Sequence, residues 1–503
     1  MKLSIICYLS DDKKLNQTTV EALEKMASYS LEHDNQVTVA GKHVDKKYNN
    51  GKKDSVTASY EVEVILNTDR VQDDRSWYEN VITRIGNHAF TSKVNKETYV
   101  SEQEAHQKMA EKASGDYIMI IHAGDDISSN LAEVFVKGNV QCYDMDTYMI
   151  TKAFHDETFG AFRNYKKVTD GEDIKSFYII DLKSKYDCFP FGFGGVIIRA
   201  EAFKKQSVDP ALGLEAERDF MLRLMAKAMK TCFLPYATLT AYEYEEHDNT
   251  FYRGLYMREW YFESITDFWM PFLQEMKVTY GSIPVFIQYN FMYSVMARFN
   301  GNMDNKNKHV IEEGHGEEYL ELIGQALRLI EENIMLNRNK VVDCITGDTM
   351  KWVYGILRNG KAYKFERFFL AGKIYYGIGD TLFNSLMSLS TNILFINYRD
   401  GMLEIDGTVH PILYSMVDEV YFRYDNKKYK IQYNERYGLT KAFGAAICKR
   451  HSFHLSIPVK DKSESELFCE AAIGNQLEPI NSLSIAFQPC LQCLWKQPLG
   501  IRR

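Results

Sequence analysis

The first half of the chain alternates short apolar runs with longer amphipathic segments. Runs at 3–9, 60–66 and 117–121 have a suitable length for buried strands. Capping boxes, in which Ser or Thr is followed three positions later by Glu, predict helix starts at Thr18 and at Ser101. Strands that alternate with helices indicate a parallel, doubly wound α/β sheet, which binds its ligand beyond the carboxyl ends of its strands.

The pattern changes twice in the second half of the chain. Residues 253–339 have a helical pattern rich in aromatic residues. A stripe of apolar residues at heptad-like spacing predicts a helix core or a seam between helices. Its members are Leu320, Ile323, Leu327, Ile330 and Ile334. After about residue 345 the apolar period becomes two, and Asp400-Gly401 between two apolar runs predicts a β-hairpin.

These patterns together predict an α/β domain with helices on both faces of its sheet, and the family resemblance described below implies that this sheet is Rossmann-like and mixed. A helical region and a β-sandwich-like domain follow it. The expected boundaries are 1–252 for the α/β domain, 253–345 for the helical region, 346–490 for the β-rich domain and 491–503 for an irregular tail.

Composition narrows the class of protein. The chain has 503 residues, which is too long for a single hydrophobic core. Its net charge of −8 argues against a general nucleic-acid-binding protein, so we expect no nucleic-acid partner. The first residues lack the pattern of a signal peptide, and no apolar run reaches membrane-spanning length.

The cysteines point to a reducing compartment. Several of them (Cys7, Cys142 and Cys232) lie within apolar runs, which predicts reduced thiols in the core of a cytoplasmic protein. Cys490 and Cys493 form a CxxC pair, but the second pair that a zinc site would need is missing from the sequence.

Candidate chemistry is concentrated after the apolar run at 117–121. That run breaks at Gly124 and is followed by two adjacent carboxylates, Asp125 and Asp126. Carboxylates at the carboxyl end of a strand can bind Mg²⁺ or Mn²⁺, and such an ion can bridge the diphosphate of a nucleotide. The alternative is that the two aspartates only cap the helix expected near Leu131.

Two later segments add weaker signals. The turn that contains Gly194 and Gly195 would let a ligand approach the backbone closely, or would simply make a tight turn. Glu217 and Asp219 begin an amphipathic helix, where acids are favoured by the helix dipole whether or not they do chemistry. His247 is a lone histidine, and such residues are more often structural than ligands.

The order of these features resembles the family 2 glycosyltransferases of the GT-A fold, over about residues 1–248. The resemblance implies transfer of a sugar, with inversion, from a nucleotide-diphosphate donor for which a UDP-sugar is favoured. It also implies a Mn²⁺ or Mg²⁺ cofactor. Asp125 would bind the metal, Asp126 would lie near the donor sugar, and Asp219 would be the base, with Glu217 as the second choice.

Further residues receive roles from the same resemblance. The donor-binding set is Tyr8, Asn67, Asp69, Asp126, His247 and Arg253, with His247 also a metal ligand, and the acceptor-binding pair is Gly194 and Gly195. The chain departs from the family where Ala123 replaces the first acid of Asp-x-Asp-Asp. It also departs where His106-Gln107 replaces Arg-Asn in the preceding helix.

The layout after residue 253 resembles the part that follows the transferase module in bacterial teichoic-acid and capsule polymerases. This implies a glycan or lipid-linked polyol-phosphate acceptor and a cytoplasmic location at the inner face of a bacterial membrane. Peripheral membrane association and homo-oligomerisation are left open. The competing interpretations are a degenerate sugar-nucleotide-binding or assembly module and a nucleotidyltransferase. The last ranks lowest because no glycine-rich loop follows the first strand.

Overall fold

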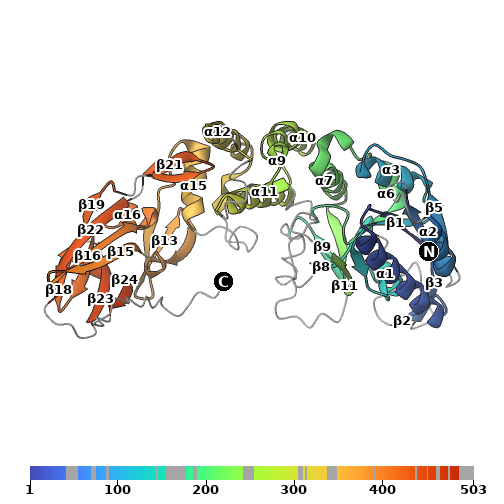
Figure 1. Ribbon diagram of the computed structural model, residues 1–503, viewed down its shortest axis with the longest axis horizontal. Coiled ribbons are helices and arrows are strands. Elements are labelled where there is room, and N and C mark those ends of the chain that lie inside the picture. Colours follow the sequence, from blue (N-terminus) through green and yellow to red (C-terminus); the bar gives the residue numbers. More distant parts are fainter. Residues whose placement is uncertain are drawn as a thin grey trace. The chain divides into compact units, whose positions relative to one another are not determined.

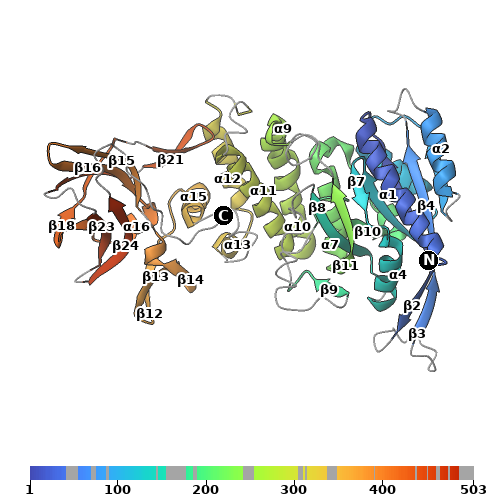
Figure 2. The same ribbon diagram turned by 60° about the horizontal axis from the view of Figure 1, so that its bottom comes forward.

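The computed structural model divides the chain into two compact units, Met1–Ser294 and Val295–Arg503 (Figures 1 and 2). The structure describes residues 1–40, 55–68, 75–86, 90–142, 145–154, 177–184, 190–241, 254–303, 310–311, 314–336, 348–389, 391–436, 439–449, 451–459, 465–473 and 476–485. The predicted sites Asp69, His247 and Arg253, the pair Cys490 and Cys493, and the tail at 491–503 lie outside these ranges.

A mixed sheet forms the centre of the first unit, with strand order β5-β4-β1-β6-β10-β8-β11-β7 and β9 paired to β11. Its strands are β1 (Lys2–Tyr8), β4 (Glu61–Asn67), β5 (Thr91–Asn95), β6 (Tyr117–His122), β7 (Asp125–Ile127), β8 (Thr147–Phe154), β9 (Tyr178–Asp181), β10 (Val196–Arg199) and β11 (Lys230–Ala241). A separate hairpin joins β2 (Gln36–Ala40) to β3 (Ser55–Ser59). The strands β5, β4, β1 and β6 run parallel, whereas β10 is antiparallel to both of its neighbours.

The register of the parallel strands collects polar side chains at one edge. Tyr8 at the end of β1 pairs with Asn67 of β4 on one side and with His122 of β6 on the other. Asn67 in turn pairs with Asn95 at the end of β5. Because parallel strands end on the same side, these four residues form a continuous row at the carboxyl edge.

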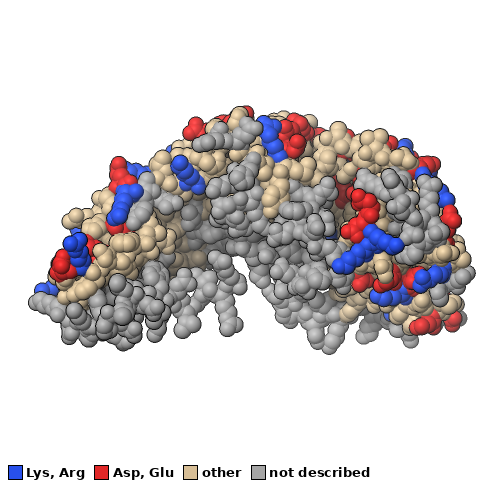
Figure 3. Space-filling view, viewed as in Figure 1, with Lys and Arg blue, Asp and Glu red and all other residues tan. Residues whose placement is uncertain are grey.

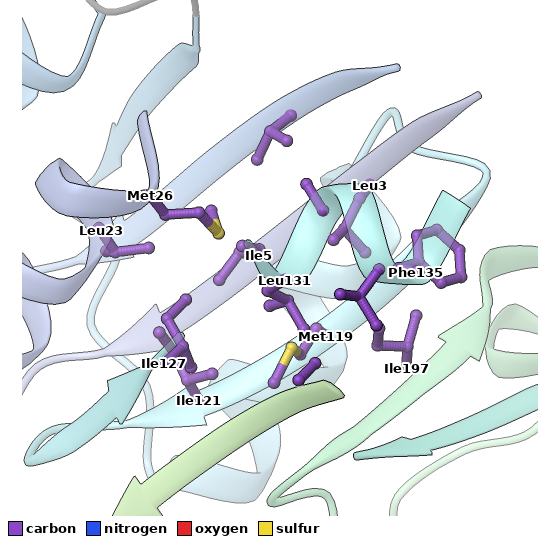
Figure 4. Packing of buried hydrophobic residues seen from close by; sticks show 14 of the residues in the cluster. Leu3, Ile5, Leu23, Met26, Met119, Ile121, Ile127, Leu131, Phe135 and Ile197 are labelled. Carbon is purple, nitrogen blue, oxygen red and sulfur yellow. The ribbon is translucent and has the colours of Figure 1, made fainter. Parts of the chain in front are cut away.

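Helices cover both faces of this sheet, which confirms the predicted α/β architecture. On one face α1 (Lys13–Glu32) and α4 (Leu131–Gln141) pack on the strands, and Figure 4 shows Leu23 of α1 and Phe135 of α4 in a cluster with Ile5 and Met119. On the other face lie α3 (Glu102–Lys112), α6 (Ala200–Lys204) and α7 (Ala216–Ala228). The clustered side chains are essentially inaccessible to solvent, so their burial is the main stabilising contribution in this unit.

The two predicted capping boxes have different outcomes. The one at Ser101 is confirmed, because α3 begins at Glu102 and the Ser101 hydroxyl accepts the N–H of Glu104 at 3.1 Å. The one at Thr18 is wrong. Helix α1 begins at Lys13, capped by Asp12, so Thr18 lies one turn inside the helix, where its hydroxyl donates to the Lys14 carbonyl.

The remaining helices of the first unit are α2 (Arg75–Gly86), the 3₁₀ helix η2 (Pro210–Glu215), α9 (Arg258–Tyr261), the π-helical turn η3 (Ser264–Trp269) and α10 (Met270–Tyr280). Helix α11 spans Val285–Met303. The second unit contains α12 (Gly316–Leu327), α13 (Glu332–Leu336), α15 (Asp348–Asn359), the short η4 (Leu386–Ser388) and α16 (Pro411–Met416). The five residues of the predicted heptad-like stripe are all buried, as expected for a helix core.

The β-region of the second unit is a sandwich, as predicted. One sheet has the order β15-β16-β22-β19, and the other has the order β18-β17-β23-β24. These strands are β15 (Asn392–Arg399), β16 (Met402–Val409), β17 (Glu419–Tyr424), β18 (Lys427–Lys430), β19 (Gln432–Asn434), β22 (His451–Pro458), β23 (Ser465–Ile473) and β24 (Gln476–Ile485). A three-stranded sheet of β12 (Glu366–Leu370), β13 (Lys373–Ile378) and β14 (Thr381–Ser385) and a hairpin of β20 (Leu439–Ala442) and β21 (Ala445–Lys449) complete the unit.

The predicted hairpin turn has the expected conformation. Asp400 and Gly401 connect β15 to β16 with φ values of 53° and 82°. Positive φ at both central residues is the geometry that matches the twist of paired strands. Side chains of the two sheets meet in a buried cluster. Ile405 and Phe453 come from one sheet, and Phe422 comes from the other.

Charged side chains of both signs are interspersed on the face shown in Figure 3. Ion pairs between exposed side chains, such as Lys96 with Glu79, contribute little to stability individually. The predicted core thiols Cys7, Cys142 and Cys232 are buried and unoxidised. Within the described part of the chain, none of the helices has the length and apolar character required to cross a membrane.

Candidate functional site

The capping box of α3 positions two potential ligands on one helical face. The Ser101 hydroxyl accepts the Glu104 N–H, and the Glu104 carboxylate accepts the Val100 N–H at 2.9 Å. This reciprocal pairing fixes the helix start, so Glu102 lies in the first turn and His106 lies one turn later on the same side. Both therefore face the carboxyl edge of the sheet near His122.

The turn between β6 and β7 positions Asp125. Gly124 has φ of 96°, a conformation that side-chain-bearing residues rarely adopt, and its N–H donates to the Thr19 hydroxyl at 2.9 Å. The chain therefore turns back at once, and the Asp125 carboxylate accepts the N–H of His122 at 2.8 Å. The same Asp125 oxygen lies 3.6 Å from Nδ1 of the His122 ring.

Glu217 approaches the same ring from α7. One of its oxygens accepts the Phe193 N–H at 3.1 Å, and the other lies 3.4 Å from His122 Nε2 and 3.4 Å from His106 Nδ1. A Cβ atom at Gly192 would lie only 2.7 Å from the first oxygen. The glycine is therefore required at this position so that the carboxylate can reach the turn.

We call Glu102, His106, His122, Asp125 and Glu217 the carboxylate–histidine cluster. Burial alone would lower the pKa of His122, but the Asp125 and Glu217 carboxylates raise that pKa well above its ordinary value. Burial alone would likewise raise the pKa of Glu217, but His106 and His122 hold it well below its ordinary value. The cluster is thus a group of carboxylate and imidazole side chains that stabilise one another's charges in a poorly hydrated environment.

Part of this cluster has the composition of a metal site. Glu102, His106 and His122 each offer one ligand atom, and these atoms all lie within 4.8 Å of one another. Both ring nitrogens of His106 are buried, and neither has a hydrogen-bond partner among the described residues. Imidazole nitrogen and carboxylate oxygen are both ordinary ligands of divalent cations, so the residues fit such an ion.

The two adjacent aspartates face different surroundings. Asp125 is buried beside His122, whereas Asp126 pairs along β7 with Thr240 of β11. Burial raises the pKa of Asp126, and Glu21 of α1 adds to that rise while Lys25 opposes it. Neighbouring strand residues point to opposite faces, so only Asp125 joins the cluster. Both lie within β7, and the residue before α4 is Asn130, so neither aspartate caps that helix.

The two carboxylates of α7, Glu217 and Asp219, also lie in different surroundings. Asp219 is buried and accepts from Arg223 Nε at 2.8 Å, and Arg223 in turn pairs with Glu275 of α10. Burial raises the pKa of Asp219, although Arg223 opposes that shift. The structure therefore brings Glu217 into the cluster and leaves Asp219 in an ion pair on another side of the helix.

The remaining residues predicted for the site lie around the carboxyl edge of the sheet. The ring of Tyr8 meets that of His106 edge-on, with 6.4 Å between the ring centroids. Asn67 is fully buried and accepts from the Asn95 side chain at 3.1 Å. Gly194 approaches Lys152 of β8, because a Cβ atom there would lie 2.7 Å from Lys152 Nζ, and Gly195 has φ of 79°.

Sequence reasoning did not select Glu102, His106 or His122 as site residues. A signal was present, because the confirmed capping box gives the phase of α3 and places Glu102 and His106 four residues apart on one face. His122 ends the strand that leads to Asp125. Nothing in the local pattern, however, shows that the helix and the strand end meet.

No protein-family model matches the chain, and no match is found among curated proteins. Solved structures do match. The crystal structure of Staphylococcus aureus TarS is 10% identical with a TM-score of 0.44, and the match covers 95% of this chain and 77% of that one. TarS 1–349 in complex with UDP-GlcNAc is 12% identical with a TM-score of 0.42, covering 76% of this chain and 99% of that one.

A mannosyltransferase, PcManGT from Pyrobaculum calidifontis, in complex with GDP-Man and Mn²⁺, is 13% identical with a TM-score of 0.35. That match covers 65% of this chain and 81% of the other. The chain is thus similar to solved glycosyltransferase structures, as the resemblance in its sequence predicts.

Proposed function

We propose that the chain is a glycosyltransferase that moves a sugar from a nucleotide-diphosphate donor to a hydroxyl of a glycan or polyol-phosphate acceptor, with inversion. The observation that carries this proposal is the convergence of Asp125 and Glu217 on His122 at the carboxyl edge of the parallel strands. In open α/β sheets this edge is where nucleotides and their substrates bind.

Sugar transfer requires a base for the acceptor hydroxyl, and Glu217 has the better position for that role. Its carboxylate accepts the Phe193 N–H and contacts the His122 ring at 3.4 Å, so its orientation is fixed before substrate arrives. A positioned general base contributes about 10²–10⁴ in rate. Asp219, the first choice from the sequence, lies outside the cluster in an ion pair with Arg223, so we assign the base to Glu217.

Asp125 positions His122 from the opposite side of the ring. Its own orientation is fixed by the backbone N–H of His122, so the carboxylate and the imidazole form one rigid element. Tyr8 and Asn67, in the same row at the sheet edge, are the proposed contacts of the donor nucleotide. When bound in the cluster, a divalent cation would supply positive charge to the departing diphosphate.

The donor and the setting of the reaction complete the proposal. A UDP-sugar is the favoured donor, and a lipid-linked cell-surface polymer at the inner face of a bacterial membrane is the favoured acceptor. Both follow from the sequence resemblance over about residues 1–248 and from the layout after it. A sugar-nucleotide-binding module without turnover is the competing function, because Ala123 stands where the family has its first acid.

The test is nucleotide release from a panel of nucleotide sugars, with and without glycan acceptors, in Mn²⁺. We expect release by the full chain and a loss of about 10² or more in Glu217→Gln. Asp219→Asn should lose much less, and Glu201→Gln on the exposed surface of α6 is the matched charge control. Nucleotide binding without release on any acceptor would instead establish the binding module.

A further inference from the structure

We infer that Glu102, His106 and His122 form a metal site that prefers transition-metal ions such as Co²⁺ or Zn²⁺ to Mg²⁺. The inference deepens the proposed function, because it names the ligands of the cation near the donor. It rests on side-chain geometry, however, and its test requires no turnover. The ligands come from α3 and from the end of β6, not from the Asp-x-Asp-Asp segment of the family.

The spacing of the ligand atoms suits one ion. Glu102 Oε1 lies 3.8 Å from His106 Nε2 and 3.7 Å from His122 Nε2. Two ligands bound to one ion at about 2.0–2.2 Å are roughly 3.0–3.5 Å apart. The two carboxylate–imidazole distances therefore need to close by only a few tenths of an ångström, and all three ligand atoms lie within 4.8 Å of one another.

His106 provides the second observation. Its side chain is fully buried, yet neither ring nitrogen has a hydrogen-bond partner in the described part of the chain. The nearest carboxylate oxygens, at 3.4 Å on Glu217 and 3.8 Å on Glu102, are not aligned for hydrogen bonds. An unsatisfied buried polar group destabilises the folded state, so its retention calls for an explanation. A bond to a cation would supply the missing partner.

The surroundings of His122 are those of a metal-bound imidazole. Its Nε2 faces Glu102, while its Nδ1 faces the Asp125 carboxylate at 3.6 Å. Histidine ligands commonly present one nitrogen to the metal and the other to a carboxylate that fixes the ring orientation. In this arrangement Asp125 is a positioning residue, and Glu217, 3.4 Å from both imidazoles, lies beside the three ligands.

The donor set determines which ions bind. Mg²⁺ prefers oxygen ligands and gives up its water reluctantly, whereas imidazole suits Zn²⁺ and the later first-row transition metals. Two imidazoles and one carboxylate therefore favour the transition metals. The Glu102–His106 spacing adds to this preference, since residues four apart on a helix chelate one ion with little reorganisation.

The test is direct binding of Co²⁺ alone to the full chain after removal of bound metals with a chelator. Visible absorption of Co²⁺ reports coordination by nitrogen and oxygen, and elemental analysis gives the stoichiometry. We expect one ion per chain, displaced by Zn²⁺ but not by Mg²⁺ at about 100-fold higher concentration, with Mn²⁺ a weaker competitor than Zn²⁺. Glu102→Gln and His122→Gln affect partly exposed residues, which avoids the folding risk of changing His106.

The variants separate a ligand role from a general charge effect. Glu102→Gln and His122→Gln should weaken Co²⁺ binding about 10- to 100-fold or more. Glu111→Gln removes the same charge from the far end of α3, where the side chain is exposed, and should bind as the unchanged chain does. Equal binding by all three variants, or no stoichiometric Co²⁺ binding by the full chain, would overturn the inference. Co²⁺ binding that depends on Glu102 and His122 would support it even if nucleotide release failed.

Discussion

Glu217 and Asp219 are two residues apart on α7, and this spacing gives them different partners. Residues separated by two positions on a helix do not share a face. Glu217 therefore reaches His122 and the Phe193 N–H, while Asp219 reaches Arg223. The sequence showed that both acids lie in the first turn of a helix. It could not show which face meets the sheet edge, because that depends on contacts between distant segments.

The two glycines of the turn before β10 allow a sharp test at the residue scale. A Cβ atom at Gly192 would lie 2.7 Å from a Glu217 oxygen that the Phe193 N–H already holds. A Cβ atom at Gly194 would meet the end of the flexible Lys152 side chain at the same distance. Gly192→Ala should therefore displace Glu217 and lower nucleotide release by about 10-fold or more, given the sensitivity of catalysis to such shifts.

Gly194→Ala is the matched control, because a Cβ atom there would meet the end of a lysine side chain and not a carboxylate of the cluster. Nucleotide release and thermal stability of both variants would be measured together. If Gly192→Ala releases nucleotide at the rate of the unchanged chain, the role of Glu217 is contradicted. A selective loss of transfer to acceptor in Gly194→Ala would support the acceptor-binding role predicted from the sequence.

Glu63 provides a prediction on pH and stability. It is fully buried in β4, and burial alone would raise its pKa, but Lys93, Ser4 and Ser114 lower that pKa from 4.5 to about 2. A carboxylate whose pKa is lower in the folded state stabilises the fold above the unfolded pKa and loses that contribution as pH falls. The contribution should therefore be complete above about pH 5 and disappear toward about pH 2.

Glu63→Gln should accordingly reduce the free energy of unfolding by up to about 3 kcal/mol at about pH 7. The difference from the unchanged chain should shrink as the pH falls through the acidic range. Urea unfolding at a series of pH values measures it. Glu61→Gln, at an exposed position two residues earlier on the same strand, is the control and should show little effect. A difference independent of pH would show that shape, and not charge, matters at Glu63.

At the scale of elements, identical capping motifs produced different structures. Both Thr18 and Ser101 precede Glu by three positions, yet only Ser101 caps a helix. Asp12, upstream of Thr18, accepts the N–H groups of Lys14 and Leu15 and so begins α1 earlier. A capping motif describes a local hydrogen-bonding option, and a competing cap one turn away can take precedence. Strand and hairpin patterns were more reliable, because burial of one face fixes their period.

This difference predicts a pattern of stability changes. Ser101→Ala and Asp12→Ala should each cost about 1 kcal/mol, because each removes a helix cap. Thr18→Ala should cost close to nothing, since Ala is the better helix former inside a helix. Thermal or urea unfolding of the three variants gives the comparison. Equal losses in Thr18→Ala and Ser101→Ala would mean that Thr18 caps a helix in solution.

For the whole molecule, the sequence predicted the kinds of layers but not the order of the strands. Apolar periodicity indicated an α/β sheet, then helices, then a sandwich, and the structure confirms each. The antiparallel insertion of β10 between β6 and β8 has no local signature, since strand pairing is decided by which apolar faces meet. The carboxylate–histidine cluster depends on the same long-range placement, because its members come from four different elements.

The two units have separate hydrophobic cores, so destabilisation should be local. Leu23 belongs to the core of the first unit and Ile405 to that of the second, and both side chains are fully buried. Truncation of such a residue to Ala typically costs about 2–5 kcal/mol. We expect two calorimetric transitions, with Leu23→Ala lowering one and Ile405→Ala lowering the other. Nucleotide release should follow the Leu23 transition, because the cluster lies in the first unit. A single transition that both substitutions lower equally would show that the two cores unfold together, as one cooperative structure.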